Sequence, residues 1–512
     1  MCGIAGFCNF KEDFEENTDY WNFRLEKMRA VLAHRGNDAR GRFLKKHIGL
    51  SHSRLAIRDI LCGDQPMTRT HNGYDYTICY NGEIYNTDEL IPELSENGFV
   101  CSTTSDTEVI LYAYIHWGAD FVNRLNGIFA FAIWDAAKNR LLLYRDRVGV
   151  KPLFYAIRGD SLVFGSEPKA CFAHPAVKPE LDKQGLQELL AIGPAHTSGL
   201  SLFKDLFEVL PGHFMIYSQD GLHDETYWEL TSREHTESYW DTVAHTRFLV
   251  EDAIKRQMVS DVPVCTFLSG GIDSSIVTAI AANYMNTRGK TLNTFSFDFK
   301  DNDRYFKANA FQPERDLPYV NRMLEEYETA HSYLECDENS LFKALFAAVD
   351  AKDMPGMTDV DSSLLYFCSL VSRKNKVALT GECADEIFGG YPWFYRKELL
   401  ERYGFPWSSD VAPRLALLRD DVGLELDLSG YQAFRYEESR SKAPLLYGEA
   451  GEDESRRIIG YLNIKWFMQT LLDRMDRTSM YSELEARVPF ADHRIIEYVF
   501  NVPWHMKYQN GV

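Results

Sequence analysis

The sequence predicts two domains, an α+β half followed by an α/β half, and three observations support this fold class. The chain has 512 residues, more than a single hydrophobic core usually holds. Short strand patterns recur along the first half of the chain. In the second half, an apolar strand leads through a glycine-rich turn into an amphipathic helix.

Composition places the chain among globular proteins and argues against several functions. Hydrophobic residues make up 45% of the chain and charged residues 25%, both ordinary values. The net charge of −20 argues against nucleic acid or an anionic membrane as a partner. The 10 cysteines form no C-x-x-C pair, which predicts reduced thiols in a cytoplasmic protein. Neither a signal peptide nor a membrane-spanning run is predicted.

The elements of the first half follow from the spacing of apolar residues. Strands are predicted at residues 140–144, 161–164 and 214–217, and helices at 21–33, 106–117 and 181–191. The polar stretch 231–238 predicts a domain boundary, which gives one domain at residues 2–230 and another at 239–512. A helix at 239–258 opens the second domain.

Cys2 is the candidate nucleophile of the first half. Removal of Met1, which a small second residue permits, would place the α-amine of Cys2 beside its own thiol. An α-amine has a pKa of roughly 8 and suits a general base near neutral pH. The alternative is a small buried cysteine on an edge strand, and Cys2 alone does not decide between the two.

An ordered series of motifs in the first half resembles the class II glutamine amidotransferases. The series consists of His34-Arg35-Gly36, Ser53-Arg54-Leu55-Ala56-Ile57, Asn81-Gly82-Glu83-Ile84-Tyr85-Asn86 and Ser105-Asp106-Thr107-Glu108, followed by residues 127–131, 145–153 and 165–167. Asn37 stands where the family usually has proline. The resemblance implies an N-terminal-nucleophile hydrolase fold, which is an αββα sandwich, and the release of ammonia from glutamine.

The resemblance also implies a role for each motif. These roles are nucleophile for Cys2, oxyanion hole for the Asn81 amide and the Gly82 N–H, carboxylate binding for Arg54, and binding of the glutamine ammonium group for Glu83 and Asp106. Taken singly, Arg54 could form a surface ion pair, and Asn81-Gly82 is a favoured hairpin turn. Their joint order along the chain favours the catalytic interpretation.

The central motif of the second half is the segment 269–275, between an apolar strand at 262–268 and a helix at 274–285. A helix start offers free N–H groups, and glycines let the backbone approach a phosphate closely. The charge of Asp273 suits such a site if Mg²⁺ lies between carboxylate and phosphate. The alternative is a glycine-rich connection with a helix cap. A Walker A loop is excluded, because Tyr284 stands five positions before Gly289 where that motif needs glycine.

A second loop carries three acids in five positions. A short strand at 377–380 precedes Gly381, Glu382, Asp385 and Glu386, acids that are costly to bury without a cation or substrate. An exposed acidic turn is the alternative. Together with segment 269–275, this loop resembles the ATP pyrophosphatases and, in particular, the synthetase half of the glutamine-hydrolysing asparagine synthetases. That resemblance implies an α/β domain with a parallel sheet.

The resemblance assigns further roles in the second half. ATP or pyrophosphate would contact Leu268, Ser269, Gly270, Gly271, Asp273, Ser274, Phe297, Thr380 and Gly381. Asp273 and Asp385 would bind Mg²⁺, and Glu382 would assist when ammonia attacks the adenylate. The strand at 292–299 ends in Phe297-Asp298, where relatives usually have Val-Gly.

Several positions depart from the family pattern. Cys383 replaces a glycine and Ala491 a leucine, whereas segment 353–363, where relatives hold the acceptor, cannot be matched residue by residue. The polar segment 301–316 has no role that we can read from sequence. Relatives continue to a lysine in a K-x-x-L-R segment, so we expect either a further tail after Val512 or loss of that lysine.

These observations predict a glutamine-dependent asparagine synthetase that uses glutamine, aspartate, ATP and Mg²⁺ and passes ammonia through an internal tunnel. The resemblance also implies a homodimer. One alternative is the same chemistry on another carboxylate, such as a cell-wall or antibiotic precursor, and segment 353–363 motivates it. Another is a binding or regulatory protein that has lost the chemistry. Lactam-forming synthetases usually lack the N-terminal cysteine machinery that is complete here.

Overall fold

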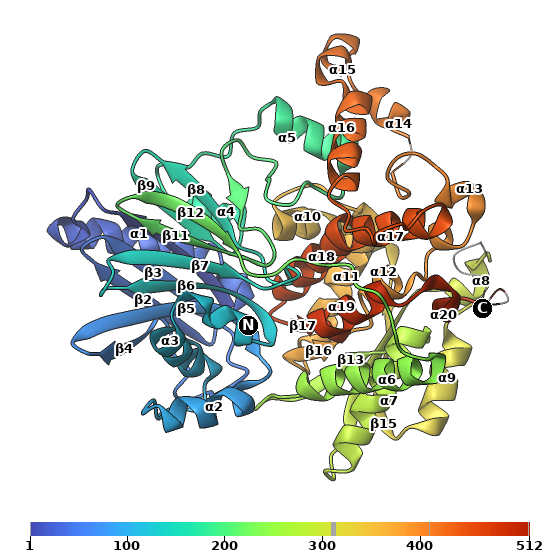
Figure 1. The fold of residues 1–512 in the computed structure, drawn as a ribbon, viewed down its shortest axis with the longest axis horizontal. Helices are drawn as coiled ribbons and strands as arrows, with labels where there is room; N and C mark the ends of the chain where they lie inside the picture. Colours follow the sequence, from blue (N-terminus) through green and yellow to red (C-terminus); the bar gives the residue numbers. More distant parts are fainter. Residues whose placement is uncertain (1, 309–313, 409, 510, 512) are drawn as a thin grey trace.

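The computed structural model describes residues 2–308, 314–408, 410–509 and 511. Its N-terminal half is built on two antiparallel sheets that lie face to face (Figure 1). One sheet has the order β10 (Phe207–Glu208), β8 (Phe154–Arg158), β9 (Ser161–Gly165), β1 (Cys2–Asn9), β3 (Ile48–Arg54) and β2 (Ala39–Lys45). The other has the order β12 (Gly221–Thr226), β11 (His213–Ser218), β7 (Arg140–Arg145), β6 (Gly127–Asp135), β5 (Tyr74–Ile84) and β4 (Met67–His71).

Helices cover the outer faces of both sheets, so the N-terminal half is an αββα sandwich, as predicted. Side chains from the two inner faces, such as Leu50 and Ala132, form a buried layer between the sheets. Helix α1 (Thr18–Ala30) buries Leu25 and Met28 against the outer face of the first sheet. Helices α2 (Thr87–Glu96) and α3 (Asp106–Trp117) cover the second sheet.

The C-terminal half is built on one parallel sheet, which confirms the α/β prediction. Its order is β15 (Thr329–Cys336), β14 (Leu292–Phe299), β13 (Val264–Phe267), β16 (Val377–Leu379) and β17 (Glu485–Arg487). Helices α6 (Tyr239–Arg256), α7 (Ile272–Asn286) and α19 (His493–Asn501) share one core with the sheet. Helix α11 (Thr358–Val371) covers the other face, beside α10 (Glu338–Lys352) and α18 (Met468–Met480).

The remaining helices surround these layers. They are α4 (Pro168–Phe172), α5 (Lys183–Gln187), α8 (Asn302–Tyr305), α9 (Leu317–Glu326), α12 (Ala384–Phe388), α13 (Lys397–Leu400), α14 (Ala412–Leu415), α15 (Asp420–Leu426), α16 (Leu428–Arg440), α17 (Glu452–Leu462) and α20 (Trp504–Lys507). Among the described residues, no helix has both the length and the apolar character needed to cross a bilayer.

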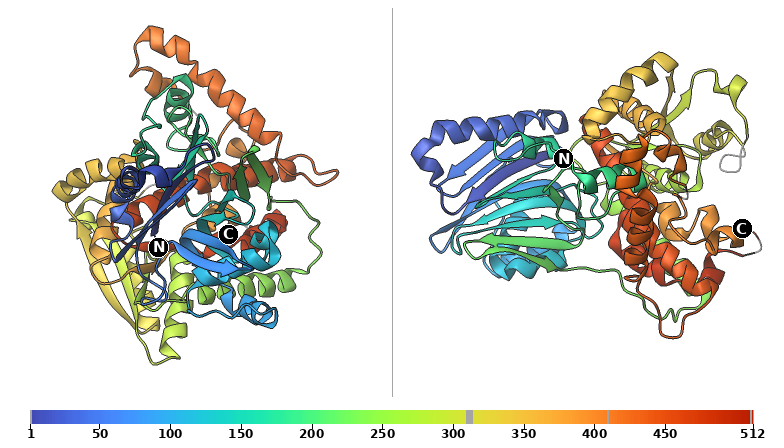
Figure 2. Two further views of the ribbon diagram at one scale, coloured as in Figure 1. Left: turned by 90° about the vertical axis from the view of Figure 1, so that its left-hand side faces the viewer. Right: turned by 90° about the horizontal axis from the view of Figure 1, so that it is seen from above.

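The two halves pack directly against each other (Figure 2). One buried cluster contains Leu55, Ile57 and Ile128 from the sandwich together with Leu249 and Ala253 from α6. The interface therefore continues the hydrophobic core of the C-terminal half. This packing holds the edges of the two sheets in a fixed relation, which matters for the sites below.

Most predicted elements are confirmed, with shifts of a few residues at their ends. The predicted strand 292–299 and helix 106–117 coincide with β14 and α3. The predicted helix 181–191 divides into α5 and a π-helical turn, Glu188–Ile192. Segment 301–316 contains α8, but its residues 309–313 lie outside the described residues.

Candidate active sites

Cys2 lies at the start of a central strand, so the edge-strand alternative is wrong. Strand β1 runs between β9 and β3, and Cys2 pairs with Arg54 across the sheet. The backbone N–H of Cys2 donates to Asn81 Oδ1 at 2.9 Å, and its carbonyl oxygen accepts from Arg35 Nε at 3.1 Å. Only 7% of Cys2 is exposed. The residue is thus held from both sides of its backbone.

The environment of Cys2 favours the thiolate that a nucleophile needs. Burial raises the pKa of the thiol. His52 and the positive chain terminus lower it by more than burial raises it, which brings the pKa to about 7. His52 lies on β3, and its Nε2 lies 3.1 Å from the carbonyl oxygen of Tyr80. We did not predict His52 from sequence, although its spacing of two from Arg54 places both side chains on one face of a strand.

Asn81 has one side-chain donor without a partner among the described residues. Its Oδ1 accepts from Cys2, and its Nδ2 is buried with no hydrogen-bond partner among the described residues. A buried amide N–H without a partner is costly, so a ligand oxygen at this point would relieve that cost. An oxyanion formed at the thiol of Cys2 would supply such an oxygen.

Gly82 departs from our expectation that a turn exposes its N–H. Asn81 and Gly82 lie inside β5, opposite β6, which also excludes the hairpin-turn alternative. A Cβ at Gly82 would lie 2.2 Å from the carbonyl oxygen of Ile128 and 2.8 Å from the Tyr80 ring. Glycine is therefore needed here for the close approach of two strands, whereas its donor role stays a prediction.

Glu83 on β5 and Asp106 at the start of α3 are close enough to repel each other, and the Glu83 carboxylate also accepts from Arg58 and Arg487. Both are buried, and Asp106 Oδ2 accepts from the Tyr80 hydroxyl at 2.8 Å and the Ile84 N–H at 3.0 Å. Burial and Asp106 raise the pKa of Glu83 to about 8, against the opposing effect of Arg487 and Arg58. An ammonium ligand would favour the charged form of this pair.

Arg54 is neither a surface ion pair nor a free guanidinium. The residue is 5% exposed, and Nη1 donates to Asp64 at 2.9 Å and to the Ile60 carbonyl at 3.2 Å. Nη2 donates to the carbonyl oxygens of Asp59 and Arg58. The loop 58–64 therefore wraps the side chain, and binding of a glutamine carboxylate would compete with the exposed carboxylate of Asp64.

The loop 269–275 joins β13 to α7 at the carboxyl end of the parallel sheet, where α/β proteins bind ligands. Helix α7 begins at Ile272, two residues earlier than predicted, so Asp273 lies in its first turn. Gly270 has a φ of +92°, which the sharp turn into the helix requires. The hydroxyl groups of Ser269 and Ser274 lie 3.0 Å apart inside the turn.

The acidic loop lies directly against this turn. A Cβ at Gly381 would lie 2.8 Å from the Ser274 N and 3.0 Å from the Asp273 Cβ. Burial, Asp385 and Glu382 together raise the pKa of Asp273 to about 7. These carboxylates and Thr380 line a cavity of about 490 Å³ with Ser269 and Arg474. The predicted residues of both loops therefore meet at one place.

The carboxylates of this cavity suit a hard cation. Among the described residues, no group of three or more His, Cys, Asp or Glu side chains is arranged to hold a metal alone. Mg²⁺ usually takes only one or two protein carboxylates and completes its shell with water and substrate phosphates. Burial, followed by neighbouring carboxylates, raises the pKa of Asp273 and of Asp385, and a bound cation would relieve both effects.

Two further side chains of the acidic loop have distinct environments. Glu382 Oε1 accepts from Arg474 Nη2 at 3.2 Å. Arg474 lies on α18 and was not predicted from sequence as a residue of this site. Cys383 has a φ of +79°. A non-glycine residue in this left-handed conformation costs about 1 kcal/mol or more.

A second cavity, of about 260 Å³, adjoins the first loop. It is lined by Leu268, Ser269, Phe297, Asp298 and Phe367, among others. Phe297 and Phe367 are in contact, with ring centroids 5.2 Å apart. Phe297 thus lies near the loop 269–275 in an aromatic setting that suits a nucleobase, and its contact with ATP stays a prediction.

Segment 353–363 contributes little to the larger cavity. Its Met357 lines that cavity, but Asp353 accepts from the backbone N–H of Lys169 in the sandwich at 3.3 Å and from Arg477 Nη2 of α18 at 2.8 Å. Lys352 Nζ lies 3.5 Å from Asp361.

Comparison with known proteins covers both halves. Residues 1–228 match a family described as glutamine amidotransferase domain, and residues 245–512 match the asparagine synthase family. The chain is 49% identical to asparagine synthetase [glutamine-hydrolyzing] 3 of Bacillus subtilis over 508 residues, which covers 99% of this chain and 82% of that relative.

More distant relatives align over a similar span. Asparagine synthetase [glutamine-hydrolyzing] 1 of Bacillus subtilis is 29% identical over 548 residues, covering 100% of this chain and 82% of that protein. Amidase chyE of Penicillium rubens is 29% identical over 571 residues, covering 99% and 83%.

Proposed function

The chain belongs to the family of glutamine-hydrolysing asparagine synthetases, and from this premise we propose that it transfers the amide nitrogen of glutamine to an adenylated aspartate. Residues 2–230 act as the glutaminase domain and residues 239–512 as the synthetase domain. The products are glutamate, asparagine, AMP and pyrophosphate.

The first step is hydrolysis of glutamine at Cys2. Loss of Met1 frees the α-amine, which takes the thiol proton, and the thiolate attacks the amide carbon. The Asn81 amide and the Gly82 N–H hold the resulting oxyanion. Ammonia leaves, and water hydrolyses the thioester to glutamate. Arg54, Glu83 and Asp106 hold the carboxylate and ammonium groups of the substrate.

The second step takes place at the two apposed loops. Ser269, Gly271 and Ser274 at the start of α7 bind the phosphates of ATP, while aspartate attacks the α-phosphate and displaces pyrophosphate. When bound by Asp273 and Asp385, Mg²⁺ would neutralise charge on the phosphates. Glu382 accepts a proton from the attacking ammonia, and AMP leaves.

Ammonia moves between the sites inside the protein. In bulk water at neutral pH it would take up a proton and lose its lone pair, so an enclosed route preserves the nucleophile. The two halves share a buried apolar cluster, which keeps bulk water out of that part of their interface. We also propose that the protein is cytoplasmic, in keeping with 10 cysteines that are all free. By resemblance to the family, we propose a homodimer.

The observation that carries the proposal is the environment of Cys2, where Asn81 binds the backbone with one atom and keeps a second, buried donor free. We expect Cys2→Ala to abolish ammonia release from glutamine. Asn81→Ala should lower kcat about 100-fold or more with little change in KM, because an oxyanion donor acts in the transition state. Equal ammonia release by wild type and Cys2→Ala would refute a cysteine nucleophile.

The acceptor is tested separately. With ammonia supplied directly, pyrophosphate release should depend on aspartate and should persist in Cys2→Ala, because the second site is intact. Glutamate, and carboxylates of the kind found in cell-wall precursors, serve as the comparison. No release with aspartate, together with release from another acid, would replace the asparagine assignment.

A further inference from the structure

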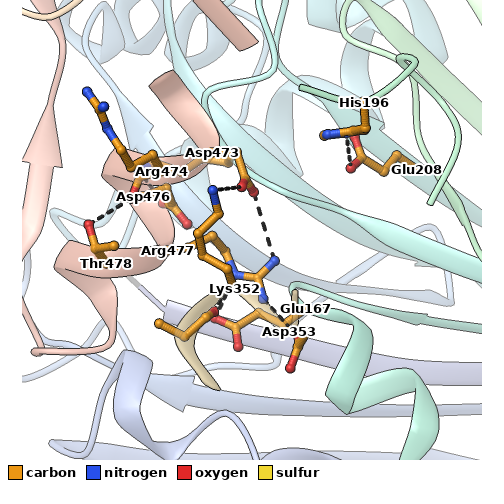
Figure 3. A network of polar contacts seen from close by, with 12 residues as sticks. Glu167, His196, Glu208, Lys352, Asp353, Asp473, Arg474, Asp476, Arg477 and Thr478 are labelled. Atoms are coloured by element: carbon orange, nitrogen blue, oxygen red, sulfur yellow. Dashed lines mark hydrogen bonds and ion pairs between the residues drawn. The ribbon is translucent and has the colours of Figure 1, made fainter. Parts of the chain in front are cut away.

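Charged side chains gather where the sandwich meets α18, and Figure 3 shows three of them, Glu167, Asp476 and Arg477. Arg35, Lys151 and Glu167 come from the sandwich and are each 0% exposed, while Asp476 and Arg477 come from α18 and are 2% and 1% exposed. Buried ions are stable only when each is paired and hydrogen-bonded. The contacts among these five residues therefore link the two halves of the protein tightly.

Arg35 is the link between this cluster and the nucleophile. Its planar guanidinium donates to the Cys2 carbonyl oxygen at 3.1 Å, to Glu167 Oε1 at 2.9 Å and to Asp476 Oδ2 at 2.8 Å. A guanidinium held by two carboxylates on one edge has a fixed plane, so the donor aimed at Cys2 is fixed as well.

Asp476 belongs entirely to this cluster. Besides Arg35, its carboxylate accepts from Lys151 Nζ at 3.0 Å. Burial would raise the pKa of Asp476, but Arg35 and Lys151 lower it overall, so the residue is anionic near neutral pH. Removing its charge would leave two buried cations of the sandwich without this partner.

Glu167 alone cannot replace Asp476 as the anchor of Arg35. Its carboxylate also binds His34 at 3.0 Å and Lys169 at 2.8 Å, and Arg477 Nε lies 3.6 Å away. With its charge shared among these groups, Glu167 is expected to draw Arg35 towards them once Asp476 is neutral. The donor to Cys2 would then move with the guanidinium.

We propose that Asp476, a residue of the C-terminal half, is a positioning residue for the glutaminase nucleophile and acts through Arg35 on the backbone of Cys2. The inference rests on the proposed role of Cys2. Small displacements of a reacting group can cost about 100-fold in rate. Asp476 can therefore affect kcat through Arg35, although it does not touch Cys2 itself. On this view the glutaminase site is complete only when the synthetase half is docked.

Helix α18 offers an internal reference for the test. Asp476 faces the sandwich, whereas Arg474 of the same helix donates to Glu382 in the synthetase cavity. A change confined to Asp476 should disturb glutamine hydrolysis and leave the ammonia-dependent reaction intact. General misfolding of α18 would impair both reactions.

The test compares three variants of the full chain. Asp476→Asn keeps the shape of the side chain and removes its charge, and Asp476→Glu restores the charge. Asp473→Asn is the matched control, because Asp473 lies one turn away on α18 and contacts Lys352 at 3.7 Å and Arg477 at 3.9 Å, both in the C-terminal half. Steady-state glutaminase kcat and KM and ammonia-dependent pyrophosphate release are measured for each.

We expect Asp476→Asn to lower glutaminase kcat about tenfold or more, with KM for glutamine and the ammonia-dependent rate within about twofold of wild type. Asp476→Glu should recover part of the loss, and Asp473→Asn should match wild type. Unchanged kcat in Asp476→Asn, equal losses in both Asn variants, or equal loss of both reactions would each overturn the inference.

If Asp476→Asn does not fold, Asp476→Glu decides. The extra methylene of glutamate displaces the carboxylate that holds Arg35, so only partial function is expected: a lowered glutaminase kcat with an intact ammonia-dependent rate supports the inference, and a fully wild-type kcat overturns it. Absence of glutaminase activity in wild type would instead refute the proposed function.

Discussion

The reactivity of Cys2 depends on a side chain from a neighbouring strand. His52 lowers the pKa of the thiol against the effect of burial, which brings it to about 7. The thiolate fraction near neutral pH is therefore sensitive to this one residue.

His52→Gln should move the pH midpoint for alkylation of Cys2 by iodoacetamide above 7, because the charge that lowers the thiol pKa is lost. At pH 7 the alkylation rate should fall roughly threefold. Mass spectrometry of the N-terminal peptide separates Cys2 from the exposed Cys62. His223→Gln, at an exposed position on β12, is the control, and an unchanged midpoint in His52→Gln would contradict the prediction.

At this scale the sequence predicted residue identities better than residue contacts. Cys2 and Asn81 are in direct contact, and Asp106 binds the backbone of Ile84 further along the strand that carries Asn81. The loop that wraps Arg54 and the role of His52 were not predicted, because side-chain orientation depends on strand register and on loop packing. Arg474 was missed because nothing in a helical pattern indicates which cavity a helix faces.

Strand β5 shows how an element limits its own sequence. A side chain at Gly82 would collide with backbone atoms of β6, since Ile128 O would lie 2.2 Å from a Cβ. β5 can move away from β6 only if the hydrogen bonds between the two strands break.

Gly82→Ala should therefore lower the free energy of unfolding by about 1–3 kcal/mol, the usual cost of overpacking. Denaturant unfolding followed by circular dichroism measures it. Gly423→Ala is the matched control, because Gly423 lies inside α15 and its nearest neighbour atom would be 3.6 Å from the new Cβ. That variant should be neutral or slightly more stable. Equal destabilisation by both would contradict the steric argument.

The loop 269–275 and the acidic loop that follows β16 form a similar close contact. Gly381→Ala would push the acidic loop away from Ser274 and Asp273, so we expect KM for ATP to rise about tenfold in the ammonia-dependent reaction. Glutaminase kcat should stay within about twofold of wild type, since the change lies in the other half. An unchanged KM for ATP would show that the loops tolerate separation.

Periodicity predicted the elements well where they are long and regular, as for β14 and α3. It placed the start of α7 two residues late, because Gly271 caps the helix by backbone geometry without a side-chain signal. The favoured-turn interpretation of Asn81-Gly82 was wrong because strand pairing across the sheet overrides a local dipeptide preference.

The ionic interface of the whole molecule has a consequence for acid stability. The pKa of Asp476 is lowered in the folded protein, so the unfolded chain binds more protons between that value and the ordinary value near 4. The stabilisation from this residue is therefore present above about pH 4 and is lost as the pH falls through the folded-state pKa.

Asp476→Asn should accordingly show a smaller loss of unfolding free energy between pH 6 and about pH 3.5 than wild type does, although it is less stable at pH 6. Urea unfolding at the two pH values measures this difference. A loss as large as in wild type would mean that other carboxylates account for the acid sensitivity.

The whole-molecule arrangement was the part least accessible from sequence. Arg35, Lys151, Glu167 and Asp476 are far apart along the chain, and each alone fits an ordinary solvated charge. Only the docking of two cores brings them together. The motifs predicted both sites, whereas their physical connection through α18 needed the fold.

The central place of β1 constrains the order of events during biosynthesis. With neighbours on both sides and Cys2 almost wholly enclosed, a trimming peptidase could not grasp this terminus once the first sheet has formed. Met1 should therefore be removed during translation, while β1 is still unfolded as it leaves the ribosome. Protein refolded after escaping that early window would carry a blocked amine and remain inert, however native its shape.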